Sequence, residues 1–400
     1  MDKLRIRAYN VLFGDAILVS VPDRNPDDSV ETRHILIDVG NVLFKSKGGE
    51  DHVFKPVMED ILNELDCEPL DLYILTHEHL DHVQGLPYAE EKFYTDSGDE
   101  LCQKLQTRYA WLTASTEKDY YKTHHEAKKR RLQFTEIYKA IDSYMKALKA
   151  SREPIPDPIE ALWANNNPRK TDDCVKYLRS LAEHTCYIHR CFDPQGQHPF
   201  HEANLEIWAP EEDTAVYYGK YRPMTMGLGF TTPPKGSRKR PTLTEIIPPP
   251  GVDAGAFYNL VNMRRGYIEN LLAIDKAANN TSVVFCLEWR GLRLLFTGDA
   301  EERSWLTMDG KGALKPVHFL KVSHHGSFNG TPEPELLDKI LPIDADDDKP
   351  RHVLVSTSEG TYHNVPDDDT LNLLRSRCDR LHEIHKEAPP GGYIDIEFKA

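Results

Sequence analysis

The chain has 400 residues, of which 40% are hydrophobic and 28% are charged, and its formal net charge is −15. This composition is typical of a globular protein with a sizeable core, and no apolar run approaches the roughly 20 residues that span a bilayer. The acidic charge excludes attraction of nucleic acid by the overall field of the protein, so binding of a polyanion must be local. The amino-terminus lacks a signal-peptide core and the cysteines are scattered, so we expect free thiols in a cytoplasmic protein without membrane contact.

The first hundred residues alternate strands with a helix. Residues 5–9 and 16–21 are predicted strands around a turn at Gly14, and residues 34–40 form a buried strand that ends in Asp38-Val39-Gly40. A helix is predicted at 55–66 and a further strand at 70–76. This order is an α/β layer pattern, in which chemistry is placed at the carboxyl ends of strands.

Residues 97–200 differ in character. Residues 97–150 are charged, contain no proline and have apolar residues at helical spacing, which predicts two or more long helices. A proline-rich linker is predicted at 151–168 and a helix at 172–183. We therefore interpret 97–200 as a helical insertion between two halves, 1–96 and 201–400, and as a candidate surface for a protein partner or a second copy of the chain.

The second half returns to strands. A strand at 204–210 precedes a loop at 222–252 that is rich in proline, glycine and threonine, and a hairpin is predicted at 282–299. The loop contains four basic residues that are candidates for phosphate contacts, namely Lys235, Arg238, Lys239 and Arg240. Further strands are predicted at 317–322 and 352–356, with helices at 301–308, 334–340 and 367–378.

The densest chemical motif is His77-Glu78-His79-Leu80-Asp81-His82, directly after a predicted strand. Imidazole and carboxylate are suitable ligands for zinc, manganese and iron. His77 and His79 lie two residues apart and can point the same way, and Asp81 and His82 can reach a second position close by. One loop cannot complete the ligand sets of two metals, so other segments must contribute.

Three other predicted strands also end in side chains that bind metals. Asp299 follows Thr-Gly, His324 and His325 follow the strand at 317–322, and His363 follows the strand at 352–356. Each motif alone is weak evidence for a metal site, since a Gly-Asp turn or a His pair is common. Four strand ends that all deliver such side chains indicate a metal site.

The pattern His77-x-His79-x-Asp81-His82 resembles the signature of the metallo-β-lactamase fold superfamily, and Asp38, Asp299 and His325 follow in that family's order. Within the superfamily the chain most resembles the hydrolase domain of bacterial DNA-uptake (competence, ComEC-type) proteins. The resemblance covers roughly 1–95 and 200–385, but not 97–200. It is carried by six stretches, at 14–18, 35–40, 74–77, 279–283, 295–301 and 320–327.

The resemblance implies a four-layer αββα sandwich with a large helical insertion, and two divalent metal ions, Zn²⁺ or Mn²⁺, between its sheets. One ion would be bound by His77 and His79. The other would be bound by Asp81 and His82, and Asp299 would bridge the two ions. The remaining assignments are His325 as the last ligand of the second ion and Asp38 as the support of the histidine loop, with His324 as a supporting residue or alternative ligand.

One position departs from the family pattern. Many members supply another histidine just before the strand that here begins near Ser282, but this chain has Asn279 and Asn280 there, as the competence-type members do. The first ion would then be weakly held, or would use His363. His363 can equally be a general acid for the leaving group, so both roles stay open.

The function that the resemblance implies is a two-metal phosphodiesterase or nuclease that acts on DNA or another nucleic acid through a metal-bound hydroxide. Asp81, Asp299 and His363 would be its catalytic residues. A second basic cluster, at 128–131, can also hold the phosphate backbone, although four basic residues on a helix are more often a solvated face. Two alternatives stay open. One is hydrolysis of a small ester, lactone or phosphodiester at the same site, and the other is a partner-binding component of a multi-protein system, such as a defence system.

Overall fold

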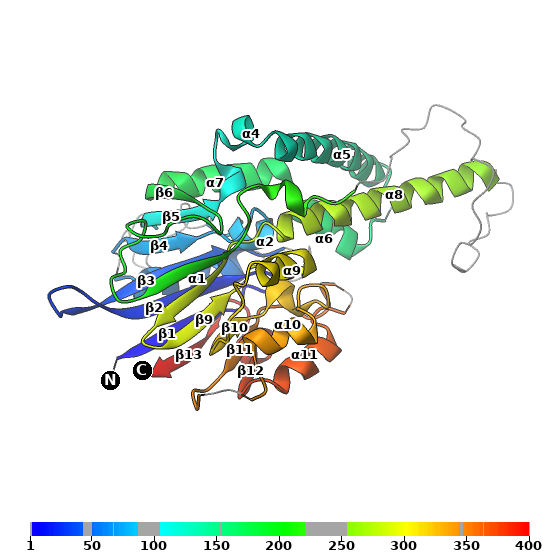
Figure 1. Cartoon of the computed structure of the whole chain (residues 1–400). Coiled ribbons are helices and arrows are strands. Elements are labelled where there is room, and N and C mark those ends of the chain that lie inside the picture. The colour runs from blue at the N-terminus through cyan, green and yellow to red at the C-terminus, as the bar shows by residue number, and fades with distance from the viewer. Residues whose placement is uncertain are drawn as a thin grey trace.

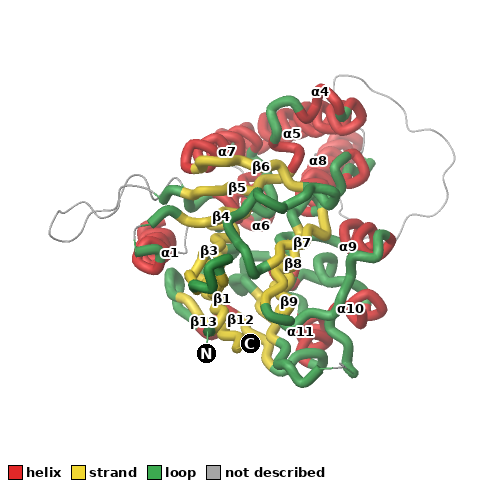
Figure 2. The backbone as a smooth tube through the Cα atoms, turned by 60° about the vertical axis from the view of Figure 1, so that its left-hand side comes forward, coloured by secondary structure: helices red, strands yellow, loops and turns green. Residues whose placement is uncertain are grey.

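The computed structural model describes residues 2–42, 50–66, 68–86, 105–152, 154–220, 254–344, 347–362 and 364–399, with the side chains of 50, 51 and 254–265 left aside. Within this part of the chain, two β-sheets lie face to face, and helices cover the outer side of each (Figures 1 and 2). The predicted αββα sandwich is therefore confirmed.

The first sheet has seven strands in the order β13-β1-β2-β3-β4-β5-β6. β3, β4, β5 and β6 run parallel, whereas β13, β1, β2 and β3 alternate in direction. Because β1 pairs with β13, the two ends of the chain lie side by side (Figure 1). The strands are β1 (Lys3–Tyr9), β2 (Ala16–Arg24), β3 (Val30–Val39), β4 (Leu70–Ile74), β5 (Thr107–Thr113), β6 (Ala182–Ile188) and β13 (Tyr393–Lys399).

The second sheet has six strands in the order β12-β11-β10-β9-β8-β7. β9 to β12 run parallel, and β7 and β8 complete the sheet in antiparallel fashion. The strands are β7 (Asn204–Ala209), β8 (Val284–Trp289), β9 (Leu292–Phe296), β10 (Phe319–Lys321), β11 (His352–Val355) and β12 (Arg380–Glu383).

Both faces of each sheet are apolar, because successive side chains of a strand point to opposite faces. In β2, Ile17 and Val19 belong to the core between the sheets, whereas Leu18 packs against the outer helices. In β8, Phe285 faces the inter-sheet core and Cys286 faces the other side. Strands buried on both faces need helices on the outside, which explains the four layers.

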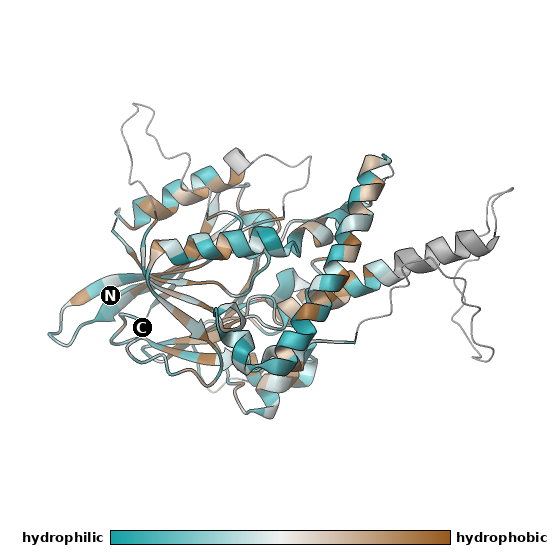
Figure 3. Ribbon diagram, turned by 90° about the horizontal axis from the view of Figure 1, so that it is seen from above, coloured by the Kyte–Doolittle hydropathy of each residue, from teal (hydrophilic) through white to brown (hydrophobic). Residues whose placement is uncertain are grey.

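Three groups of helices cover the sheets. α1 and α7 pack on the first sheet, α9, α10 and α11 pack on the second, and α5, α6 and α8 form a separate apolar cluster beside them (Figure 2). The helices that are coloured in Figure 3 carry both hydrophobic and hydrophilic residues. The longer helices are α1 (Glu50–Glu64), α5 (His125–Ala150), α6 (Asp157–Asn165), α7 (Pro168–Leu181), α8 (Ala254–Asn279), α9 (Glu302–Gly310), α10 (Pro334–Ile340) and α11 (Asp368–Arg375). The short ones are α2 (Leu80–Val83), α4 (Tyr120–Thr123), α12 (Ile384–Glu387) and the 3₁₀ turns Ala114–Thr116, Thr214–Tyr217 and Ser323–Gly326.

The prediction of helix throughout 97–150 is wrong at Thr107–Thr113, which forms β5 of the first sheet. Leu105, Tyr109 and Leu112 match helical spacing by coincidence. In the strand, Trp111 faces the inter-sheet core and Leu112 faces the helices. A parallel strand that is buried on both faces has no clean period of two, so periodicity alone does not separate it from a helix.

The predicted linker at 151–168 is wrong as well, because Asp157–Asn165 forms α6 with Pro158 in its first turn, where proline suits a helix. No prediction was made for α8, and β5 and β6 show that part of 97–200 belongs to the first sheet. The division of the chain into three segments stays a prediction. The loop at 222–252, with Lys235, Arg238, Lys239 and Arg240, lies outside the described residues.

None of the helices in the described part of the chain combines the length and apolar character that crossing a membrane requires. The five cysteines that the structure describes are free thiols, namely Cys174, Cys186, Cys191, Cys286 and Cys378.

A buried carboxylate joins the two halves of the sandwich. Asp23, near the end of β2, is fully buried and accepts backbone N–H groups of His201 at 2.8 Å, Glu202 at 2.7 Å and Ala203 at 3.2 Å, just before β7. The Nε of Arg33 in β3 donates to the same carboxylate at 3.1 Å. Asp23 thus ties the first sheet to the start of the second.

We expect Asp23→Ala to lower the free energy of unfolding by about 3 kcal/mol or more, because it leaves buried N–H donors and a buried guanidinium without their acceptor. Denaturant titration measures this change. Asp173→Ala is the matched control, since the side chain of Asp173 on α7 is 78% exposed and only a surface pair is lost. A loss for Asp23→Ala that does not exceed the loss for Asp173→Ala contradicts this role.

Candidate metal centre

Four parallel strands, two from each sheet, deliver polar residues to one edge of the sandwich. Asp38 ends β3, the loop with His77 follows β4, the turn with Asp299 follows β9, and His325 follows β10. The carboxyl ends of neighbouring parallel strands meet at the same edge of a sheet. Because the two sheets pack face to face, the residues from both sheets come together at this edge.

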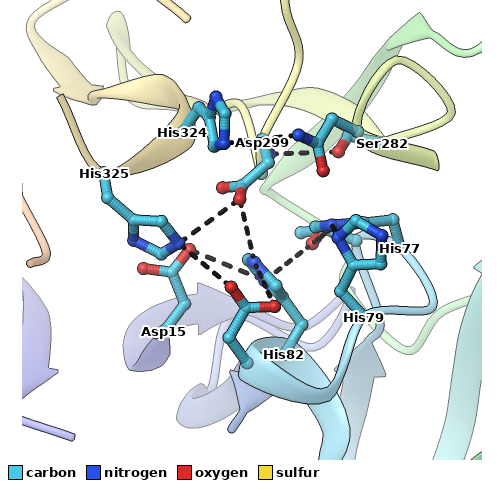
Figure 4. Close-up of polar contacts among 12 residues, drawn as sticks. Asp15, His77, His79, His82, Ser282, Asp299, His324 and His325 are labelled. Atoms are coloured by element: carbon cyan, nitrogen blue, oxygen red, sulfur yellow. Dashed lines mark hydrogen bonds and ion pairs between the residues drawn. The ribbon is translucent and has the colours of Figure 1, made fainter. Parts of the chain in front are cut away.

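Two aspartates and two histidines form the centre of this site. Asp81, His82, Asp299 and His325 are all buried, and one ligand atom from each lies within 4.8 Å of the others. Oδ2 of Asp299 lies 3.3 Å from Nε2 of His82 and 3.3 Å from Nε2 of His325 (Figure 4). Asp81 reaches the same two nitrogens at 3.7 and 3.6 Å. Asp299 therefore occupies the middle of the group.

Hydrogen bonds fix the direction of the imidazoles. Nδ1 of His82 lies 2.7 Å from Oδ2 of Asp38, and Nδ1 of His325 lies 2.8 Å from the carbonyl oxygen of Ser356. Such contacts select the tautomer, so the opposite Nε2 of each ring faces the centre. The carboxylate of Asp38 also accepts the hydroxyl of Thr76 at 2.7 Å.

His77 and His79 form a second group with Asp81. Nε2 of His77 lies 3.0 Å from Nδ1 of His79, and the far nitrogen of His79 lies 3.0 Å from Oδ1 of Asn166. Two ligand-type nitrogens therefore face each other. Burial, helped by the neighbouring imidazoles of His82 and His79, holds the pKa of His77 well below its ordinary value, so this ring is neutral, as a metal ligand must be.

The central group has a strongly negative potential. Burial disfavours a charge on His82 and His325, but the carboxylate of Asp299 and the other aspartates outweigh it. The pKa of His82 is raised well above its ordinary value, and the pKa of His325 is raised to about 10. The same potential attracts a cation.

Several buried atoms of this group lack a hydrogen-bond partner in the part of the chain that the structure describes. They are Oδ1 of Asp81, Nε2 of His82, Oδ1 of Asp299 and Nε2 of His325. Buried polar atoms normally have partners, and these atoms are of the types that divalent metals bind. The residues present therefore fit a metal ion, and the buried histidine and aspartate groups can bind metal ions.

The sequence analysis did not identify Asp15 and Lys321, which are buried charged residues next to the central group. Lys321, at the end of β10, is 2% exposed, contacts the carboxylate of Asp15 and lies 3.6 Å from Oδ1 of Asp299. Burial opposes its charge, but Asp15 and Asp299 outweigh it and raise the pKa of Lys321. A lysine inside an apolar strand was the available signal, because lysine is almost never fully buried unless paired.

The backbone around the site is unusual in two ways. Asp38, His324 and His325 have left-handed φ angles of 53°, 49° and 55°, which non-glycine residues rarely adopt and which are frequent at functional sites. At Gly40, an added Cβ would lie 2.4 Å from the backbone nitrogen of His82. Glycine there lets α2 pack directly on the end of β3.

Two residues at the end of α6 reach into the site. Oδ1 of Asn165 accepts the backbone N–H of Asp81 at 3.1 Å, and Asn166 contacts His79 as described. Both asparagines lie at the carboxyl end of α6. The side chain of Asn166 also donates to Oδ1 of Asp275 in α8 at 2.8 Å. Asn165 and Asn166 thus support the histidine loop directly.

The two asparagines at 279 and 280 point to different places. Asn280 bonds the backbone and hydroxyl of Ser304 in α9, so it fixes the start of that helix. Asn279 contacts a third group of ligand-type residues, Asp275, Glu301 and His324. Burial raises the pKa of Asp275 to about 7. Only Asn279 of the pair therefore faces the site.

A cavity of about 240 Å³ opens beside the centre. His79, Asp81 and Asp299 line its floor, while Leu162 of α6 and Leu272 of α8 are among the apolar side chains of its walls. Among the described residues that line it, Lys276 is the one lysine or arginine.

The other candidate phosphate contacts are only partly located. In the basic cluster at 128–131 on α5, Lys128 and Lys129 are exposed, whereas Nη2 of Arg131 lies 3.9 Å from Oε2 of Glu78 in the histidine loop. Arg131 alone of these four therefore lies beside that loop. His363 lies outside the described residues, as do the four basic residues of the loop at 222–252.

Comparisons with known proteins give a distant structural likeness. No protein-family model matches the chain, and no curated protein matches its sequence. The structure is similar to the crystal structure of a long form RNase Z from yeast, with 11% sequence identity and a TM-score of 0.35. The match covers 98% of this chain but 41% of that one. The interpretation of the site therefore depends on the side chains described above.

Metal binding should be visible in the stability of the protein. We expect Mn²⁺ or Zn²⁺ at about a hundredfold its dissociation constant to stabilise the fold by about 2.7 kcal/mol per site, because an ion held only by the folded state shifts the equilibrium. Thermal unfolding with and without the ion measures this. Asp299→Asn should remove most of the shift, while Asp173→Asn on the surface of α7 should keep it. Equal shifts in both variants would exclude Asp299 as a ligand.

Proposed function

We propose that the chain is a metal-dependent hydrolase of the metallo-β-lactamase fold superfamily that cleaves phosphodiester bonds, with nucleic acid as its substrate. The observation that carries this proposal is the convergence of ligand atoms at one edge of the sandwich. Imidazole nitrogens of His77, His79, His82 and His325 face one another and two buried aspartates, while the far nitrogens of three of these rings are held by Asn166, Asp38 and the carbonyl of Ser356.

In this proposal the residues divide between two ions, Zn²⁺ or Mn²⁺. His77 and His79 would hold the first, Asp81, His82 and His325 would hold the second, and Asp299 would be a ligand of both. When bound, two such ions lower the pKa of a water between them and neutralise charge on the phosphoryl oxygens. Asp38 and the carbonyl of Ser356 keep Nε2 of His82 and His325 directed at the centre, which pre-organises it before substrate arrives.

Other charged residues have supporting roles in this proposal. Lys321 offsets part of the charge of Asp15 and Asp299 and keeps the bridging carboxylate in place. We retain His363 as a candidate for either a ligand of the first ion or the proton donor to the leaving oxygen. Lys235, Arg238, Lys239 and Arg240 remain candidates for phosphate contacts, and 97–200 remains a candidate partner surface.

A specific observation favours a second candidate, a small ester or phosphodiester with an apolar group. The cavity beside the centre has apolar walls, from Leu162, Leu272 and others, and offers Lys276 as its one lysine or arginine among the described residues. Apolar walls with few polar groups are typical of small-molecule sites. A polynucleotide would need basic side chains from elsewhere on the molecule.

The purified protein with Mn²⁺ or Zn²⁺ should cleave bis(p-nitrophenyl) phosphate and single-stranded DNA or RNA. We expect Asp81→Ala to lower kcat/KM by about 100-fold or more, because loss of a supporting residue alone typically costs about 10–100-fold. Asp173→Ala on the surface of α7 is the matched control and should keep full activity.

The choice of substrate distinguishes the candidates. Cleavage of nucleic acid as well as the small phosphodiester supports the proposed function, whereas cleavage of p-nitrophenyl esters or the small phosphodiester alone supports the second candidate. No hydrolysis of any of these substrates, or hydrolysis that survives Asp81→Ala, contradicts the proposed mechanism.

A further inference from the structure

Asn279, the last residue of α8, has an unusual environment. Its side chain is 1% exposed, and its amide nitrogen lies 2.9 Å from Oε1 of Glu301, 3.3 Å from Oδ2 of Asp275 and 3.3 Å from Nε2 of His324. Its amide oxygen has no hydrogen-bond partner among the residues that the structure describes. An amide oxygen in such a position is rare, because burial without a partner costs free energy.

The carboxylates decide which way the amide points. An ionised carboxylate only accepts hydrogen bonds, so Glu301 must face the amide nitrogen and not the oxygen. Oδ2 of Asp275 lies on the same side, 3.3 Å from that nitrogen. Since the amide is planar and its nitrogen faces these groups, its oxygen faces away from them. The cavity beside the metal centre is lined by Asn279 together with His79, Asp81 and Asp299.

The same contacts argue against a separate cation between Asp275, Glu301 and His324. One ligand atom of each lies within 4.8 Å of the others, as a metal site would require. The amide nitrogen of Asn279 contacts all three, however, and so takes the position that a cation would need. These three residues act as a clamp on the amide.

We propose that the amide oxygen of Asn279 is a protein ligand of the first metal ion, beside His77 and His79, and that Asp275 and Glu301 are positioning residues that hold it there. This inference rests on the proposed two-metal function. In the proposed function the first ion would have two imidazoles, from His77 and His79, and a share of the carboxylate of Asp299, which leaves room for one further protein ligand beside an open position. The amide oxygen completes the set and satisfies its own unpaired lone pairs.

The chemistry of this set predicts a metal preference. Two imidazoles and a neutral oxygen form a harder ligand set than three imidazoles, and oxygen ligands favour Mn²⁺ relative to Zn²⁺. In Asn279→His, a ring nitrogen can donate to Glu301 while the other faces the ion. That variant should keep two sites and shift the first toward Zn²⁺.

The test is titration of the metal-free protein with Mn²⁺ and with Zn²⁺, followed by calorimetry and metal analysis. Wild type should bind two ions. Asn279→Ala should keep one site and weaken the other by about tenfold or more, and Asn279→His should restore it with a raised ratio of Zn²⁺ to Mn²⁺ affinity. The control is Asn204→Ala, because Asn204 is exposed on β7, and it should match wild type.

Three results would overturn the inference, and one of them would also overturn the proposed function. Two sites of unchanged affinity in Asn279→Ala, or an unchanged metal preference in Asn279→His, would overturn the role of Asn279 alone. A wild type that binds neither ion would overturn the proposed function together with this inference. If Asn279→Ala does not fold, the metal preference of Asn279→His decides the question.

Discussion

The rest of this structure depends on buried negative charge at the edge where the two sheets meet. Asp81 and Asp299 are buried together within 4 Å of the same two imidazole nitrogens. Carboxylates in such surroundings cost several kcal/mol each unless cations or donors compensate them. In the polypeptide alone, His82, His325 and Lys321 provide that compensation, and the raised pKa of His325 shows how strong the demand is. A bound divalent ion would compensate the same buried carboxylates directly.

This constraint explains why the surrounding backbone is so closely fitted. Left-handed residues such as His325 persist only where neighbouring contacts hold them, and here the carbonyl of Ser356 and the carboxylate of Asp299 do so. Gly40 lets α2 rest on the end of β3, so Asp38 can reach His82 at 2.7 Å. The geometry needed for chemistry therefore arises from the packing of the strands and not from one flexible loop.

Sequence reasoning predicted the sandwich, most strands of the second half and the strand-end residues, because short polar motifs after apolar runs mark strand ends directly. It missed β5, since a strand buried on both faces, with Trp111 and Leu112 on opposite sides, shows no period of two. It also missed Lys321, Asp275 and Asn166, whose roles depend on contacts between distant segments, such as the 2.8 Å bond from Asn166 to Asp275. The role of His363 stays a prediction, because that residue lies outside the described part of the chain.

The helices α6 and α8 contribute both supporting residues and cavity walls to the site. They supply Asn165 and Asn166 behind the histidine loop and Asn279 beside it, and they also form the apolar walls of the cavity. The same two helices therefore support the candidate metal ligands and line the cavity beside them. Some substitutions in the cavity walls would displace Asn166 or Asn279. Such substitutions would disturb the candidate metal centre as well as the shape of the cavity. In the proposed function, metal affinity and substrate selectivity would therefore be coupled through α6 and α8.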